Sequence, residues 1–243
     1  MSGRDLVAVV TGGSSGIGAK LCREMLDRDY TVICVARREP EFSHERLHAV
    51  AADLTDPADT ERAAAEIAAR FKVSHFVHNA GMILPNLIEE AEIADLHTLT
   101  QLHAGAALTF VQAFLPAMKQ AGFGRIIFNS SRAALGAVTR TAYSYSKAGL
   151  HGMARTWALE LGPHGITVNV VAPGPVLTDN FWGIIDKGSE RERKLADSLP
   201  VRRLGTVEDV TRALMYFADP GNGYVTGQTL YVCGGASIGG VTL

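Results

Sequence analysis

The sequence predicts an α/β domain built on a doubly wound, seven-stranded parallel sheet with helices on both faces. First, short apolar or β-branched runs alternate with helix-like stretches along the 243 residues, which implies right-handed βαβ crossovers. Second, most of these runs are apolar at consecutive positions, as expected for strands that helices cover on both faces. Third, the chain is 47% hydrophobic and 20% charged, which suits one large domain.

The expected elements follow one another along the chain in alternation. Strands are expected at 7–10, 31–36, 48–53, 75–81, 125–131, 167–174 and 229–235. Helices are expected at 17–28, 57–71, 96–121, 143–162 and 206–218. Asp56, which precedes Pro57, and Thr206 are suitable N-caps for two of these helices. The domain should span residues 1–243, with an irregular segment at about 175–205 acting as a lid for a substrate.

Composition and charge favour a small soluble ligand over a macromolecular partner. The formal net charge is -2 and the isoelectric point is near 6.4, so neither nucleic acid nor an anionic membrane is expected as a partner. No apolar run approaches the roughly 18 residues of a membrane span, so we expect a cytoplasmic protein. The cysteines are scattered and odd in number, so we expect reduced structural thiols at Cys22, Cys34 and Cys233.

A glycine-rich turn follows the first expected strand. Residues 7–18 read VAVVTGGSSGIG, a strand and a turn followed by the start of a helix. Glycine lets a pyrophosphate approach the main chain, and the N–H groups of a helix start favour its negative charge. A nucleotide phosphate is therefore expected here. The turn also fits the G-x-S-x-G nucleophile elbow of α/β hydrolases, but a place on the first strand argues against that interpretation.

Several motifs, in order along the chain, resemble those of the short-chain dehydrogenase/reductase family, especially its members similar to 3-oxoacyl-acyl-carrier-protein reductases. They are Thr11-Gly12-x-x-x-Gly16-Ile17-Gly18, Asp53-Leu54, Asn79-Ala80-Gly81, Ser131, Tyr143-x-x-x-Lys147, Asn169, Pro173-Gly174 and Tyr224-Val225-Thr226-Gly227-Gln228. The resemblance covers nearly the whole chain. It implies a Rossmann-like fold, an oxidoreductase that interconverts a ketone and a secondary alcohol, and a homotetramer or homodimer.

Two tyrosines precede Lys147, and helix geometry distinguishes them. Residues four apart share one face of a helix, so Tyr143 lies next to Lys147 while Tyr145 points elsewhere. A nearby ammonium favours the phenolate and should lower the tyrosine pKa from its usual value of about 10. The resemblance implies that Tyr143 is the general acid or base and that Lys147 also holds the nicotinamide ribose.

The resemblance also implies a serine that hydrogen-bonds the reacting oxygen. Successive strand residues face opposite sides, so only one of Ser130 and Ser131 can serve. Counting from Gly124-Arg125, the family pattern falls on Ser131. Eleven residues separate Ser131 from Tyr143, about one fewer than in many members, so Ser130 remains an alternative. The glycosylation sequon at 129–131 is discounted because it lies at a strand end.

His103 departs from the family pattern, which usually has an asparagine at this position. In the family, the main-chain carbonyl of that residue helps to hold a water that connects the lysine to solvent. His103 could keep this role if the helix bends here in the same way. Its imidazole could instead titrate near neutrality and carry protons, or the residue could simply pack in the core.

The residues after the second strand indicate NADP rather than NAD. There is no acid at Ala36 to bind a ribose hydroxyl, whereas Arg37, with Arg38, can bind a 2′-phosphate through charge-assisted hydrogen bonds. A solvated basic loop is the alternative. The complete set of expected cofactor contacts is Gly12, Ser14, Ser15, Gly16, Ile17, Gly18, Arg37, Arg38, Asp53, Leu54, Asn79, Ala80, Gly81, Tyr143, Lys147, Pro173, Gly174, Val176 and Thr178.

Other patterns leave the substrate open. Residues 44–48, HERLH, match H-E-x-x-H, but the space between two strands is too short for its helix, so a surface loop and no metal are expected. The charged run 189–194 could contact an acyl-carrier partner or form a solvated helix face. Side chains that would suit an apolar or aromatic ketone, or pack in the lid, are Leu135, Val138, Phe181, Trp182, Ile184 and Ile185. A nucleotide-binding regulatory protein without turnover is the alternative function.

Overall fold

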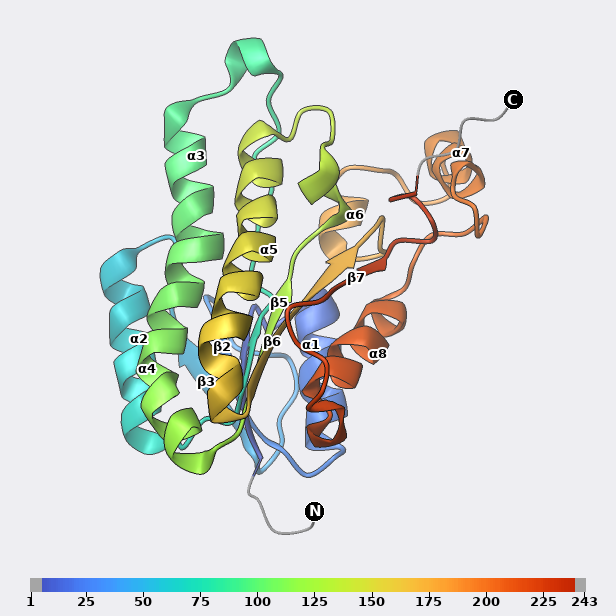
Figure 1. Ribbon diagram of the computed structural model, residues 1–243. Helices are drawn as coiled ribbons and strands as arrows, with labels where there is room; N and C mark the ends of the chain where they lie inside the picture. Colours follow the sequence, from blue (N-terminus) through green and yellow to red (C-terminus); the bar gives the residue numbers. More distant parts are fainter. Residues whose placement is uncertain (1–5, 239–243) are drawn as a thin grey trace.

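Seven parallel strands form one sheet in the computed structural model, which describes residues 6–238 (Figure 1). Their order is β3-β2-β1-β4-β5-β6-β7, and the order reverses between β1 and β4. Doubly wound sheets bind ligands at such a reversal, beyond the carboxyl ends of the strands. The predicted sheet is confirmed, with strands β1 (Val7–Thr11), β2 (Thr31–Ala36), β3 (Leu47–Ala51), β4 (His75–His78), β5 (Gly124–Asn129), β6 (Ile166–Pro173) and β7 (Thr229–Val232).

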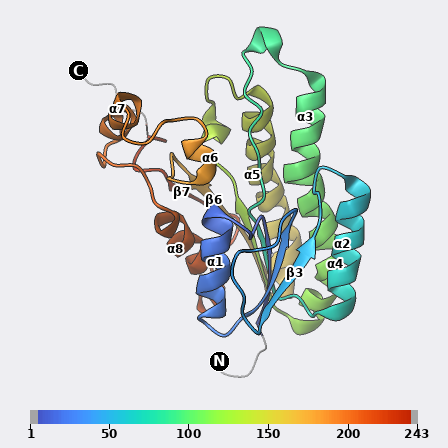
Figure 2. The same ribbon diagram turned by 180° about the vertical axis from the view of Figure 1, so that it is seen from behind.

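Helices cover both faces of the sheet, as Figures 1 and 2 show from opposite sides. One face carries α2 (Pro57–Arg70), α4 (Ala106–Ala121) and α5 (Thr141–Leu161), and the other carries α1 (Gly16–Leu26) and α8 (Val207–Ala218). The two predicted N-caps are present. Asp56 accepts the N–H of Ala58 at the start of α2, and Thr206 forms a capping box with Asp209 at the start of α8.

The long helix expected at 96–121 is interrupted by a π-helical turn. It consists of α3 (Ile93–Thr100), the π-turn η2 (Gln101–Gly105) and α4. The N–H of Ala106 bonds to the carbonyl of Gln101, five residues back, instead of the carbonyl four residues back that an α-helix would use. Turns of this kind occur frequently at functional sites.

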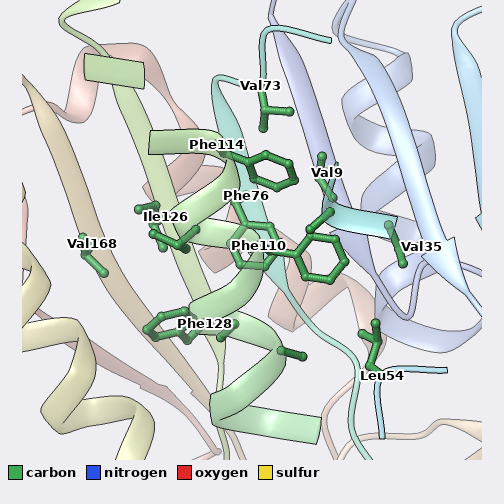
Figure 3. Close-up of a cluster of buried hydrophobic side chains, with 14 of the residues drawn as sticks. Val9, Val35, Leu54, Val73, Phe76, Phe110, Phe114, Ile126, Phe128 and Val168 are labelled. Atoms are coloured by element: carbon green, nitrogen blue, oxygen red, sulfur yellow. The ribbon is translucent and has the colours of Figure 1, made fainter. Parts of the chain in front are cut away.

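Aromatic packing fixes this helix against the middle of the sheet (Figure 3). Phe110 and Phe114, one turn apart on α4, pack on Phe76 of β4 with ring centroids 5.6 and 5.7 Å away. All three side chains are buried, and such aromatic pairs contribute about 0.5–1.5 kcal/mol beyond their burial. Since α4 is anchored on β4, the π-turn that precedes α4 is held close to the end of β4.

Two segments outside the main helices were only partly predicted. The expected lid contains α6 (Asp179–Trp182) and α7 (Glu190–Ser198), which lie toward the carboxyl end of the sheet near β6 and β7 (Figure 1). The charged run forms α7, which has no buried residue and carries an ion pair between Glu190 and Lys194. Residues 44–46 form a loop as expected, but Leu47 and His48 already belong to β3, and residues 6–238 contain no cluster of His, Cys, Asp or Glu suited to a metal ion.

The cysteines are reduced and buried, as the sequence predicts. Cys22, Cys34 and Cys233 are free and buried, and Cys22 of α1 hydrogen-bonds to Cys34 of β2. Within the described residues, none of the helices combines the length and the apolar character that crossing a membrane requires.

Candidate active site

A cavity of about 550 Å³ opens at the carboxyl ends of the strands, where the sheet order reverses. Most of the predicted site residues line it: Gly12, Ser14, Ser15, Gly16, Ile17, Arg37, Arg38, Asp53, Leu54, Asn79, Ala80, Gly81, Ser131, Tyr143, Lys147, Pro173, Gly174, Val176 and Thr178. Gly18 and His103 do not line the cavity. Segments far apart in the sequence therefore meet in one hollow.

The glycine-rich turn presents free main-chain N–H groups at the start of α1. Its N-cap, Ser15, makes no side-chain cap bond, and the first turn of the helix contains no acid. The turn is held by the amide of Asn79, which donates to the carbonyls of Thr11 and Gly12 at 3.1 and 3.2 Å. Gly18 lets α1 approach closely, because a Cβ there would collide with the Gly12 carbonyl. This arrangement fits a pyrophosphate group.

Basic side chains dominate the cavity beyond β2. Arg37 and Arg38 line it, and no ion pair joins either of them to another residue in the described part of the chain. Asp53 is the one acid among the lining residues. It accepts hydrogen bonds from the N–H and the hydroxyl of Thr55, which lower the pKa of its carboxyl, and the charge of Arg37 lowers it further. Two arginines thus remain available for a phosphate.

Helix α5 places Tyr143 and Lys147 together, as the spacing predicts. The ammonium nitrogen of Lys147 lies 5.8 Å from the ring centroid of Tyr143, and both residues line the cavity. Tyr145 is 57% exposed and does not line it. Of the two tyrosines, Tyr143 alone can meet a ligand in this cavity.

The pKa of Tyr143 differs from the sequence-based expectation. Burial raises the pKa of its phenol above the usual value, and the groups that partly offset this rise are the Ser131 hydroxyl, by a hydrogen bond, and the Arg140 charge. Lys147, which was expected to lower this pKa, is not among the groups that do so. The phenol is therefore protonated at neutral pH in this structure and can serve as a proton donor.

Lys147 is almost completely enclosed. Its side chain is buried, and its Nζ donates a hydrogen bond of 2.8 Å to the carbonyl of Asn129 at the end of β5. The Asn129 amide donates in turn to Asn79, which holds the glycine-rich turn. Burial lowers the pKa of Lys147 from 10.5 to about 7. This amine can therefore gain or lose a proton near neutrality.

The two adjacent serines face different surroundings. Ser130 is buried and donates its hydroxyl to the carbonyl of Lys147 at 2.9 Å, with His151 Nε2 also at 2.9 Å. Ser131 accepts the N–H of Ala133 at 3.1 Å and hydrogen-bonds to Tyr143. Since the Ser130 hydroxyl is engaged away from Tyr143, the geometry favours Ser131.

His103 lies in the π-turn. It is fully buried, its ring packs edge-on against Tyr143 at 5.7 Å, and its Nδ1 lies 2.9 Å from the Ser146 hydroxyl. Burial, reinforced by the charge of Lys147, holds the pKa of His103 far below its usual range. The alternative in which the imidazole titrates near neutrality therefore has no support. The helix changes to a π-turn at this residue, so its main-chain hydrogen bonds depart from the α-helical pattern here.

The substrate end of the cavity differs from the expectation. Of the six apolar residues expected to flank the site, Phe181 and Ile184 line the cavity and the other four do not. Leu135 and Val138 are 56% and 83% exposed and do not line it. Side chains that the sequence analysis missed are Met82, Ile83, Arg132, Ala133, Ala137 and Arg140. Their closeness in sequence to Gly81, Ser131 and Tyr143 was the available signal.

The known proteins that this chain is similar to are named as reductases and dehydrogenases. The family model described as enoyl-(acyl carrier protein) reductase matches residues 12–237. The chain is 34% identical to (2S)-[(R)-hydroxy(phenyl)methyl]succinyl-CoA dehydrogenase subunit BbsD of Thauera aromatica, covering 96% of each chain. It is 30% identical to the 3-oxoacyl-[acyl-carrier-protein] reductase FabG of Salmonella typhimurium, covering 97% of this chain and 98% of FabG. A solved structure of ElxO with NADP bound superposes with a TM-score of 0.88 at 27% identity, covering 96% of this chain and 98% of ElxO.

Proposed function

The chain belongs to the short-chain dehydrogenase/reductase family, and we propose that it interconverts a ketone and a secondary alcohol with NADP as its preferred cofactor. It is an NAD(P)-dependent oxidoreductase that acts on CH–OH groups. Our proposal concerns three further points, which are the preference for NADP, the carbonyl substrate and the roles of individual residues.

The cofactor end of the cavity has the donors that NADP needs. The free N–H groups at the start of α1 would bind the pyrophosphate, and Arg37 with Arg38 would bind the 2′-phosphate. Asp53 and the segment Asn79-Ala80-Gly81 would meet the adenine and its ribose, and residues 173–178 would meet the nicotinamide end. When bound, the cofactor supplies or accepts a hydride. The NADP found in ElxO supports this choice of cofactor.

The protein side chains would supply the proton and polarise the substrate. Tyr143 holds its proton at neutral pH because burial raises its pKa, so it can donate that proton to a carbonyl oxygen. Ser131 accepts the Ala133 N–H and hydrogen-bonds to Tyr143, and its O–H would donate to the same carbonyl oxygen when a substrate lies beside the phenol. Lys147 would hold the nicotinamide ribose and could return a proton to Tyr143, since its own pKa is about 7.

The observation that carries the proposal is that one cavity is lined by Ser131, Tyr143 and Lys147 and, at its other end, by a glycine-rich turn and two arginines that form no ion pair among residues 6–238. The apolar lining from Met82, Phe181 and Ile184 supports an apolar or aromatic ketone as the substrate.

Purified protein should consume NADPH in the presence of a panel of apolar and aromatic ketones. The measurement is the loss of NADPH absorbance, with NADH run in parallel. Binding of NADPH without consumption across the panel would contradict the proposal and favour a regulatory role. Faster consumption of NADH than of NADPH would contradict the choice of cofactor alone.

A further inference from the structure

His78, the last residue of β4, connects the glycine-rich turn to the π-turn. It is fully buried, and its Nε2 lies 3.0 Å from the carbonyl of Leu102 inside the π-turn. Its Nδ1 lies 3.0 Å from the hydroxyl of Thr11, the residue before Gly12. Burial lowers the pKa of His78 to about 3, so the ring is neutral at ordinary pH.

The hydrogen-bond partners determine which nitrogen of His78 carries the proton. A carbonyl can only accept, so Nε2 must carry the hydrogen that bonds to Leu102. The Thr11 oxygen already accepts the N–H groups of Asn79 and Ala80, both at 3.0 Å, so its own hydrogen points to Nδ1. Both nitrogens of His78 therefore have a partner. The Thr11 hydroxyl donates one hydrogen bond and accepts two, so it has no position left.

The π-turn takes from the Leu102 carbonyl the main-chain donor that it would have in an α-helix. In an α-helix the N–H of Ala106 would bond to Leu102, but here it bonds to Gln101. A buried carbonyl that loses its donor costs about 1–3 kcal/mol unless another group replaces it. His78 supplies the replacement from the neighbouring strand, and so favours the π-turn over a regular helix at this point.

The π-turn in turn determines where His103 lies. Ser146 donates its hydroxyl to the Tyr143 carbonyl at 3.1 Å, so the nearby Nδ1 of His103 is the donor to Ser146. The lone pair of His103 is then on Nε2, which is buried and has no hydrogen-bond partner among the described residues. A Cβ on Gly81 would lie 3.0 Å from this nitrogen and 3.3 Å from Lys147 Nζ. The acceptor nitrogen of His103 and the Lys147 amine therefore both lie beside Gly81.

We propose that His78 is a positioning residue of the active site, because its bond to Leu102 holds the π-turn that places His103 beside Lys147 and Tyr143. For its effect on turnover, this inference rests on the proposed function. Its structural part, the tautomer of His78 and the shape of the turn, does not.

Two substitutions separate the two bonds of His78. In His78→Gln the side-chain amide can still donate to Leu102, whereas in His78→Asn the shorter amide can still accept from Thr11 but cannot reach Leu102. We expect His78→Asn to lower kcat by about 10- to 100-fold, which is the effect of a small misplacement of catalytic groups, with little change in the Kd for NADPH. His78→Gln should recover most of the loss. Equal kcat values for the two variants would overturn the proposal.

His75 provides a matched control in the same strand. It is equally buried, its Nε2 donates to the Ala218 carbonyl at 3.0 Å, and its Nδ1 contacts the Ser74 hydroxyl at 2.8 Å. It lies at the opposite end of β4, away from the cavity. His75→Asn should lower Tm to a similar extent as His78→Asn but leave kcat unchanged. A parallel loss of kcat in both variants would assign His78 a purely structural role.

Two measurements test the structural part without relying on turnover. Nitrogen NMR shifts of the wild-type imidazoles should show His78 with its proton on Nε2, and a proton on Nδ1 would refute the bond to Leu102 even if no variant folds. Amide hydrogen exchange of residues 101–106 should accelerate in His78→Asn and not in His75→Asn. If these results hold while no ketone is reduced, then the proposed function fails and the positioning of the π-turn stands.

Discussion

The two ends of the cavity are built from different kinds of structure. At the cofactor end, the glycine-rich turn and Arg37 directly follow strands β1 and β2, and hydrogen bonds from Asn79 hold the turn. At the substrate end, the lining comes from connecting segments, and Ile184 is 45% exposed. Main-chain geometry at the sheet edge therefore fixes the cofactor end, while side chains from loops determine the substrate end.

We expect the largest loss of activity from substitutions where the two ends of the cavity meet, at Tyr143. Tyr143→Phe removes the phenolic proton but keeps the ring that packs on His103. We expect kcat to fall on the order of 10³-fold, the contribution of a well-placed general acid, with unchanged NADPH affinity. Single-turnover kinetics and NADPH titration measure the two quantities.

Tyr145→Phe is the control for this prediction, because Tyr145 lies on the same helix with its side chain exposed. Its turnover should match that of the wild type. If Tyr145→Phe lost activity and Tyr143→Phe did not, the helix-face assignment would be wrong.

The next largest effect should be confined to the cofactor end. Arg37→Ala removes charge-assisted hydrogen bonds, each of which contributes about 1.5–3 kcal/mol, so the Kd for NADPH should rise about 10- to 100-fold while that for NADH changes little. Arg132, at the substrate end of the same cavity, is the matched comparison. Arg132→Ala should leave the ratio of NADPH to NADH affinity unchanged. An equal loss for both nucleotides in Arg37→Ala would remove the basis for NADP preference.

The sequence was more informative about the cofactor end than about the substrate end. The residues at the ends of β1, β2 and β4 are fixed relative to the sheet, so placing the strands also placed Gly12, Arg37 and Asn79. Leu135 and Val138 were expected at the substrate end and instead face solvent, because the course of a loop depends on tertiary contacts that spacing does not encode.

Two features of the region where the two ends meet could not be predicted from the sequence. The spacing of Tyr143 and Lys147 predicted their contact but not the burial that raises the pKa of the phenol. No sequence pattern predicts the π-turn. The Leu102 carbonyl within it bonds to His78, which lies on a strand more than twenty residues earlier. Both depend on contacts between distant segments.

A smaller effect, a shift in the pH dependence of the rate, should distinguish substitution of Arg140 from substitution of Arg132 at the substrate end. The charge of Arg140 lowers the pKa of Tyr143, so Arg140→Gln should raise that pKa. Ketone reduction requires the protonated phenol and declines as pH rises through its pKa, so the decline should move to higher pH in the variant. Alcohol oxidation requires the phenolate, and its rise should also move to higher pH. Rate profiles in both directions measure the shift, and Arg132→Gln should not show it.

The smallest effect is expected where apolar side chains line the substrate end. Ile184→Ala removes a partly exposed contact, so kcat/KM for an apolar ketone should fall only about 3- to 10-fold, as for the loss of a small apolar contact in a binding pocket. Leu135→Ala is the matched control, since Leu135 was expected at this end from the sequence but lies outside the cavity. Its kcat/KM should be unchanged. A larger loss in Leu135→Ala than in Ile184→Ala would mean that the substrate enters over the surface beside η3 (Arg132–Leu135) rather than beneath the lid.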